Sequence, residues 1–105
     1  MKKLLAISLL LATTATAGEY DSVETKWRTC ATCHGDVGQG KPGFPALQPL
    51  EQEQIVEALL DYQNGVYRGD MSGIMFGQAA TLGSGEVELI AKYIKEVINE
   101  ENNSN

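Results

Sequence analysis

The residues best suited to chemistry stand in one short run, Cys30-Ala31-Thr32-Cys33-His34. Two cysteines three positions apart, followed directly by a histidine, are typical of covalent attachment of a c-type haem. On a helix, residues i and i+3 share a face, so both thiols can add to the vinyl groups of one porphyrin. His34, next in sequence, then comes under the iron as a neutral imidazole ligand. The chain has no other cysteine or histidine with which to build a second centre.

Three other interpretations of this run can be weighed against haem attachment. A structural zinc site takes about four Cys or His ligands, and the chain supplies three. A thioredoxin-like redox pair belongs to a βαβ unit, and no strand pattern precedes Cys30. A structural disulfide between Cys30 and Cys33 is the remaining alternative. The motif itself favours haem attachment over these three alternatives.

Residues 1–17 have the composition of a secretory signal peptide. Lys2 and Lys3 form a basic start, a short apolar stretch follows over 4–12, and Ala15-Thr16-Ala17 fits the cleavage pattern. The apolar stretch is too short to span a bilayer as a mature helix, although a retained N-terminal anchor is the alternative. We therefore expect a periplasmic protein that is not inserted in the membrane after cleavage.

Residues 18–105 then form one small domain of 88 residues. A chain of this size buries a modest share of its surface, and a covalently held haem would stabilise it. Without Lys2 and Lys3, six basic residues stand against 14 acidic ones, a formal charge of −8. Such a chain will not bind nucleic acid or anionic membranes. Its redox partners, protein donors and acceptors of electrons, should be basic where they dock or should meet an uncharged patch.

Three helices are predicted from apolar periodicity and end signals. The first covers 21–32, with Asp21 or Ser22 as its cap and Val23, Trp27 and Cys30 on one face. The other two cover 51–64, stopped by Gly65, and 86–99, capped by Ser84. Trp27 is read as core packing rather than as an electron relay.

Two glycine-punctuated segments separate these helices, at 35–49 and 66–85. The first is expected to be a loop along one side of the porphyrin. A backbone carbonyl from Phe44-Pro45-Ala46-Leu47 is the candidate acceptor for the second ring N–H of His34.

The second segment holds Met71 and Met75, the methionines that follow the signal peptide. A thioether sulfur is a common sixth ligand of haem iron, but methionine is also ordinary core filler. The spacing alone does not show which of Met71 and Met75 would bind the iron. The neighbours Ile74 and Phe76 give Met75 the more apolar setting.

Four landmarks taken together resemble the class I cytochromes c, and most of all the short bacterial cytochromes of the c553 type. They are Cys30-x-x-Cys33-His34-Gly35, Pro45-x-Leu47, Tyr62-x-x-Gly65 and Ala91-x-Tyr93-Ile94. The resemblance covers essentially all of 18–105. It implies an all-α protein, a compact three-to-four-helix cytochrome c fold wrapped around one covalent haem, with the first and last helices crossing.

The resemblance also assigns roles to individual residues. The carbonyl of Pro45 would accept the hydrogen bond of His34. The axial methionine of the family follows a Tyr-x-x-Gly-x-Tyr stretch, here Tyr62 to Tyr67, and the matching residue is Met75. Haem c would thus be attached through Cys30 and Cys33, with His34 and Met75 on the iron. The lysine ring around the haem edge of mitochondrial relatives is absent.

These features predict a soluble monohaem carrier of single electrons between periplasmic redox partners, monomeric and not an enzyme. A haem-bearing subunit of a larger oxidase or dehydrogenase is the first alternative, which predicts a sizeable exposed apolar patch. A haem enzyme or gas sensor with an open sixth site is the second. That alternative would need a distal acid–base group, and no second histidine is available.

Overall fold

The structure is a computed structural model that describes residues 18–103, with side chains described as far as Glu101. Its helices are α1 (Asp21–His34), α2 (Gln52–Gln63), α3 (Ser72–Ala80) and α4 (Glu86–Tyr93). Helix α4 continues through a π-helical turn, η2 (Ile94–Ile98), into α5 (Asn99–Asn103). Over this range there is no strand, and a single isolated bridge pairs Lys41 with Phe44. The predicted all-α fold is confirmed, whereas the predicted signal peptide at 1–17 lies outside the described residues.

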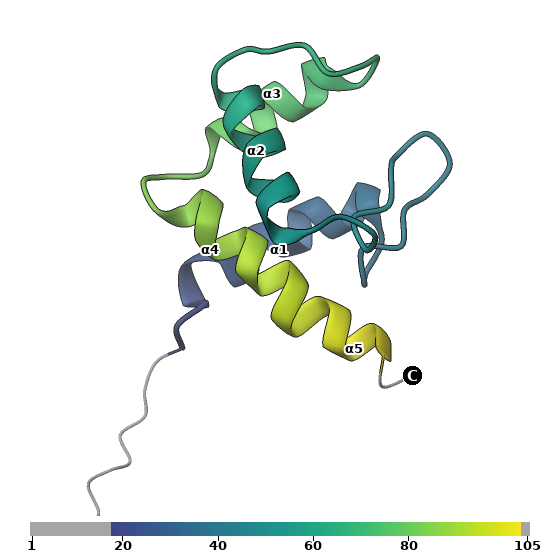
Figure 1. Ribbon diagram of the computed structural model, residues 1–105, viewed down its shortest axis with the longest axis vertical. Coiled ribbons are helices and arrows are strands. Elements are labelled where there is room, and N and C mark those ends of the chain that lie inside the picture. The colour runs from purple at the N-terminus through teal and green to yellow at the C-terminus, as the bar shows by residue number, and fades with distance from the viewer. Residues whose placement is uncertain (1–17, 104–105) are drawn as a thin grey trace, which may run out of the picture.

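The first and last helices cross, as Figure 1 shows for α1 and the α4–α5 rod. Val23 and Ala91 are completely buried at this crossing. The rings of Tyr20 and Tyr93 pack beside it with centroids 5.1 Å apart. Burial of these apolar side chains holds the two ends of the described chain together.

Helix α1 begins at the predicted residue but runs two residues beyond the predicted end at Thr32. The complete CxxCH run therefore lies on one helix. Gly35, at φ +95°, ends it, and its N–H donates to the carbonyl of Ala31 at 2.8 Å. The predicted cap is wrong, because Tyr20 occupies the N-cap position without a side-chain hydrogen bond. The Asp21 carboxylate instead accepts from the N–H of Gly18 at 3.2 Å.

Helix α2 matches the prediction to within one residue at each end. Glu51 and Gln54 form a capping box, in which the Glu51 N–H donates to the Gln54 side chain at 2.7 Å. Gly65, at φ +76°, follows the C-terminal turn. Glu51 and Glu53 are exposed, in keeping with solvated residues of a first turn.

Helix α3 was not predicted, because Gly73 and Gly77 interrupt its sequence. Each glycine costs about 1 kcal/mol relative to alanine in a helix, which hides the helical signal. The segment is helical here because it packs on α2, with the rings of Tyr62 and Phe76 6.1 Å apart in edge-on contact.

The last helix begins at Glu86 as predicted, but it extends to Asn103 rather than ending near Asn99. The predicted Ser84 cap is wrong. Gly85, at φ +81°, holds the N-cap position, and the Glu86 carboxylate accepts from the N–H of Gly83 at 2.8 Å. Within the part of the chain that the structure describes, no helix is long and apolar enough to cross a membrane.

Candidate functional site

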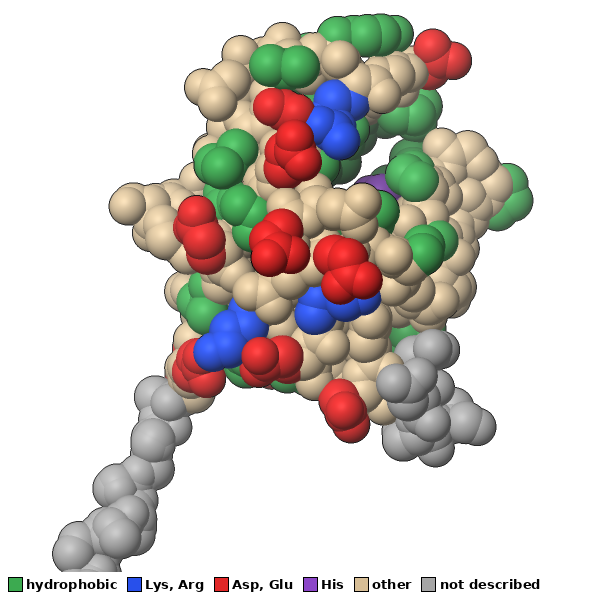
Figure 2. Space-filling model, viewed as in Figure 1, with side chains coloured by type: hydrophobic (Ala, Val, Ile, Leu, Met, Phe, Trp, Pro, Cys, Tyr) green, Lys and Arg blue, Asp and Glu red, His purple; other side chains and the backbone are tan. Residues whose placement is uncertain are grey.

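A cavity of about 710 Å³ lies between the helices and the 35–49 loop. It is visible in Figure 2 as a hollow between the lobe that carries α3 and the loop beside it, with a purple histidine side chain inside. Its volume is in the range of sites that bury a cofactor or other small molecule. Aliphatic side chains form much of its wall: Leu47, Leu50, Ile55, Leu59, Ile90 and Ile94.

Both cysteines line this cavity from α1, one turn apart. Both are half-buried, and no disulfide joins them. Burial raises the pKa of the Cys30 thiol. The helix places the two sulfurs on one face, as two attachment points on a single planar group require.

His34 also lines the cavity and is 8% exposed. Its Nδ1 atom lies 2.7 Å from the carbonyl oxygen of Pro45. Because a carbonyl oxygen can only accept, Nδ1 carries the proton and Nε2 keeps its lone pair for a metal. The ring of Phe44 packs edge-on, with its centroid 6.5 Å from that of the imidazole.

The loop that supplies this carbonyl is fixed by its own backbone. The N–H of Gly40 donates to the carbonyl of His34 at 2.6 Å, and the N–H of Leu47 donates to the carbonyl of Gly38 at 2.7 Å. Gly40 adopts φ +88°, and a Cβ placed there would lie 2.9 Å from the Ala46 nitrogen. Glycine is therefore needed where the loop passes closest to the Pro45 segment.

Both candidate methionines line the cavity from the α3 segment. Met71 is at the N-cap position and is 36% exposed, whereas Met75 lies within the helix and is half-buried. Ile74 is 48% exposed, so the surroundings of Met75 are less apolar than its sequence neighbours indicate. As a whole residue, Met75 is still less exposed than Met71.

Trp27 packs within the α1–α4 core at 4% exposure and does not line the cavity. A structural role fits that position. The zinc alternative gains no support from the structure, because 18–103 contains no group of three or more His, Cys, Asp or Glu side chains arranged to hold a metal.

These donors fit a haem. Two thiols one turn apart, an oriented imidazole and the thioethers of Met71 and Met75 line one cavity with aliphatic walls. A porphyrin is large and apolar and requires such walls around its ligands. Cys30, Cys33, His34, Pro45 and Met75 are thus brought together around one space.

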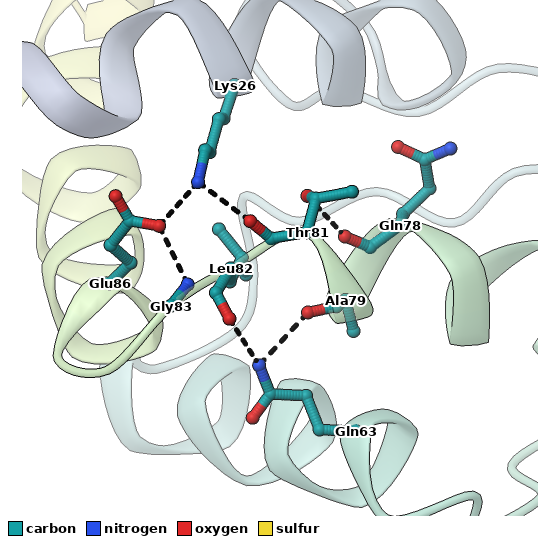
Figure 3. A network of polar contacts seen from close by, with 8 residues as sticks. All are labelled: Lys26, Gln63, Gln78, Ala79, Thr81, Leu82, Gly83 and Glu86. Atoms are coloured by element: carbon teal, nitrogen blue, oxygen red, sulfur yellow. Dashed lines mark hydrogen bonds and ion pairs between the residues drawn. The ribbon is translucent and has the colours of Figure 1, made fainter.

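Sequence reasoning missed a polar cluster beside the cavity, drawn in Figure 3. Lys26 of α1 and Gln63 of α2 donate to backbone carbonyls at the C-terminal end of α3 and in the turn after it. Each is a polar residue in an amphipathic helix, a pattern that indicates a solvated position. No local signal distinguishes these two from their exposed neighbours.

Comparison with known proteins shows which family the chain resembles. A sequence model of the family described as Cytochrome c matches residues 23–97. Cytochrome c-554(547) of Halothiobacillus neapolitanus is 34% identical over 74 residues, covering 63% of this chain and 81% of the relative. Cytochrome c-553 of Desulfomicrobium norvegicum is 30% identical over 67 residues, covering 64% and 84%. The cytochrome subunit of sulfide dehydrogenase of Chlorobaculum tepidum is 34% identical over 65 residues, covering 62% and 56%.

Proposed function

The chain belongs to the cytochrome c family and holds one covalently attached haem c, and from that premise we propose that it carries single electrons between periplasmic redox proteins. The observation that carries the proposal is the meeting of Cys30, Cys33, His34 and Met75 around one cavity. With His34 and Met75 both holding the iron, no iron site would be left open to a substrate.

Each residue of the site has a separate role in holding the haem. Cys30 and Cys33 would anchor the group covalently, and His34 would hold the iron through Nε2 while Pro45 fixes its ring. Met75 would be the other protein ligand of the iron, a thioether that favours a high reduction potential. The aliphatic walls keep water from the site and hold its geometry rigid. When bound, the haem supplies a one-electron Fe(II)/Fe(III) couple.

The charge of the surface indicates how a redox partner would dock. Lys26, Arg68 and Lys92 are each ion-paired to a carboxylate of this chain. Acidic side chains are spread over the face seen in Figure 2. A partner is therefore attracted by its own basic residues, or it docks on the apolar residues Met71 and Ile74, which line the cavity and are exposed.

We further propose that residues 1–17 are a signal peptide and that 18–105 is the mature domain, a monomer that is not an enzyme. A second candidate function has one specific observation in its favour. Similarity to a cytochrome subunit of sulfide dehydrogenase is compatible with membership of a larger complex. In that case the exposed apolar residues at the cavity rim would be covered by a stable partner.

The test uses the full chain, expressed with residues 1–17 in a bacterium that attaches haem c and purified from the periplasm. The carrier predicts a monomer with a reversible one-electron couple whose reduced form does not bind carbon monoxide. Ready binding of carbon monoxide would indicate an open sixth site. Purification in a stable complex with a dehydrogenase or oxidase would support the subunit instead.

A further inference from the structure

The helix that carries Met75 has little stability of its own. Helix α3 has nine residues, two of them glycine, and no side-chain cap at Met71. Isolated helices shorter than about 12 residues are marginal in water even for favourable sequences. A Cβ added at Gly73 or Gly77 would meet nothing within 4 Å, so close packing does not require these glycines. Contacts with the rest of the protein must therefore hold α3 in place.

One such contact comes from the last residue of α2. The Nε2 atom of Gln63 donates to the carbonyls of both Ala79 and Leu82, each at 3.0 Å. These carbonyls belong to the C-terminal end of α3 and the turn after it. The Ala79 carbonyl is one of the last four of α3, which lack an intrahelical partner, and it also accepts from the N–H of Leu82 at 3.1 Å. A single amide thus fixes both sides of the turn that ends α3, as Figure 3 shows.

A second contact reaches the same turn from α1. The Lys26 ammonium group donates to the carbonyl of Thr81 at 2.7 Å and also forms an ion pair with Glu86. The Glu86 carboxylate accepts in turn from the N–H of Gly83 at 2.8 Å. Lys26 and Gln63 approach residues 79–83 from different helices, α1 and α2, and Glu86 does so from α4. The turn is therefore tied to three helices.

We propose that Lys26 and Gln63 are positioning residues that keep Met75 at the iron by clamping residues 79–83 to the helices around them. The inference rests on the proposed His34/Met75 ligation. Neither donor group contacts the Met75 side chain. Both act through backbone carbonyls that follow it by four to seven positions. Loss of either donor frees the C-terminal end of α3 and increases the fraction of molecules in which Met75 leaves the iron.

The experiment measures how readily imidazole replaces methionine in the oxidised holoprotein. Gln63→Leu and Lys26→Met remove the two donors. We expect each to tighten apparent imidazole binding at least about threefold, the ratio that the loss of a single net hydrogen bond implies. The far-red absorption band of the thioether–Fe(III) bond should weaken in parallel. Lys26→Arg, which keeps a donor, should restore values near the wild type.

Lys95→Met is the matched control. It also removes a lysine hydrogen bond to a backbone carbonyl, that of Gln48 at 2.9 Å, but on the loop that follows His34. It should lower thermal stability without changing imidazole affinity. If Gln63→Leu does not accumulate, Gln63→Asn, with an amide one methylene shorter, should give an intermediate affinity.

The outcomes separate this inference from the proposed function. If the wild type shows the far-red band and both clamp variants bind imidazole as weakly as the wild type does, the positioning role of Lys26 and Gln63 is wrong. The proposed His34/Met75 ligation is then still supported. Equal increases in the clamp variants and in Lys95→Met would also overturn it, since general destabilisation would then explain them. If the wild type lacks the band and binds imidazole freely, the proposed ligation itself fails.

Discussion

The Nδ1 atom of His34 and the carbonyl oxygen of Pro45 lie 2.7 Å apart, although eleven positions separate the two residues. This contact joins the end of α1 to the glycine-rich loop and determines which ring nitrogen remains free. A ligand imidazole that donates to a fixed acceptor is held in one orientation and is a stronger base. The geometry of the loop is therefore part of the site.

The first prediction concerns the glycine that lets this loop close. Gly40→Ala would place a Cβ 2.9 Å from the Ala46 nitrogen and 3.1 Å from the Phe44 carbonyl oxygen. We expect it to displace the Pro45 segment, to lower the free energy of unfolding and to weaken the His34 hydrogen bond. Denaturant titration measures the free energy of unfolding, and the chemical shift of the His34 Nδ1 proton in the reduced protein reports on the hydrogen bond and on displacement of the Pro45 segment.

Gly43→Ala provides the control for that substitution. Gly43 has a similar φ of +85°, but a Cβ there would meet nothing within 4 Å. Gly43→Ala should lower the free energy of unfolding only by the backbone strain of a positive φ, about 1–2 kcal/mol. The chemical shift of the His34 Nδ1 proton should not change. Equal effects of the two substitutions on stability and on the proton would contradict the role assigned to Gly40.

The second prediction concerns removal of the attached group. A cavity of about 710 Å³ with aliphatic walls lies between the helices and the 35–49 loop of this small domain. Without a haem these walls face water or collapse on one another. Cys30→Ala/Cys33→Ala, isolated without haem, should lose much of its helical circular dichroism and its cooperative thermal transition. A haem-free protein that unfolds cooperatively near the transition temperature of the holoprotein would contradict this prediction, because its helices would then be stable without the haem.

The third prediction concerns acid stability. The N–H of Gly83, and then Lys26, hold the pKa of the Glu86 carboxyl below its usual value of 4.5. A carboxylate with a lowered folded pKa stabilises the fold above its ordinary pKa, and this contribution disappears as the pH falls through the folded value. Glu86→Gln should therefore be less stable than the wild type at neutral pH, with the difference shrinking below about pH 4.5. Stability curves that stay parallel down to acid pH would argue against this linkage.

Much of the site could be predicted because its residues belong to short sequence patterns. The CxxCH spacing places Cys30 and Cys33 on one face of a helix, and α1 carries both into the cavity. The α2 and α4 helices show strong apolar periodicity and start within one residue of the predicted positions. These signals depend on neighbours within about two helical turns.

The features that were missed depend on residues distant in sequence. Helix α3 contains two glycines, and only its packing on α2 makes it helical. The caps expected from Ser22 and Ser84 are absent, because backbone geometry at Tyr20 and Gly85 starts these helices instead. Lys26 meets Thr81 across 55 positions, a pairing that no local pattern encodes.

The identity of the sixth ligand is the central claim, and one comparison tests it most directly. The oxidised wild type, Met75→Ala and Met71→Ala are scanned for the far-red band of a thioether–Fe(III) bond. We predict the band in the wild type and in Met71→Ala, and its loss in Met75→Ala together with a lower reduction potential and carbon monoxide binding by the reduced form. Loss of the band in Met71→Ala with retention in Met75→Ala, or its absence from the wild type, would contradict the account.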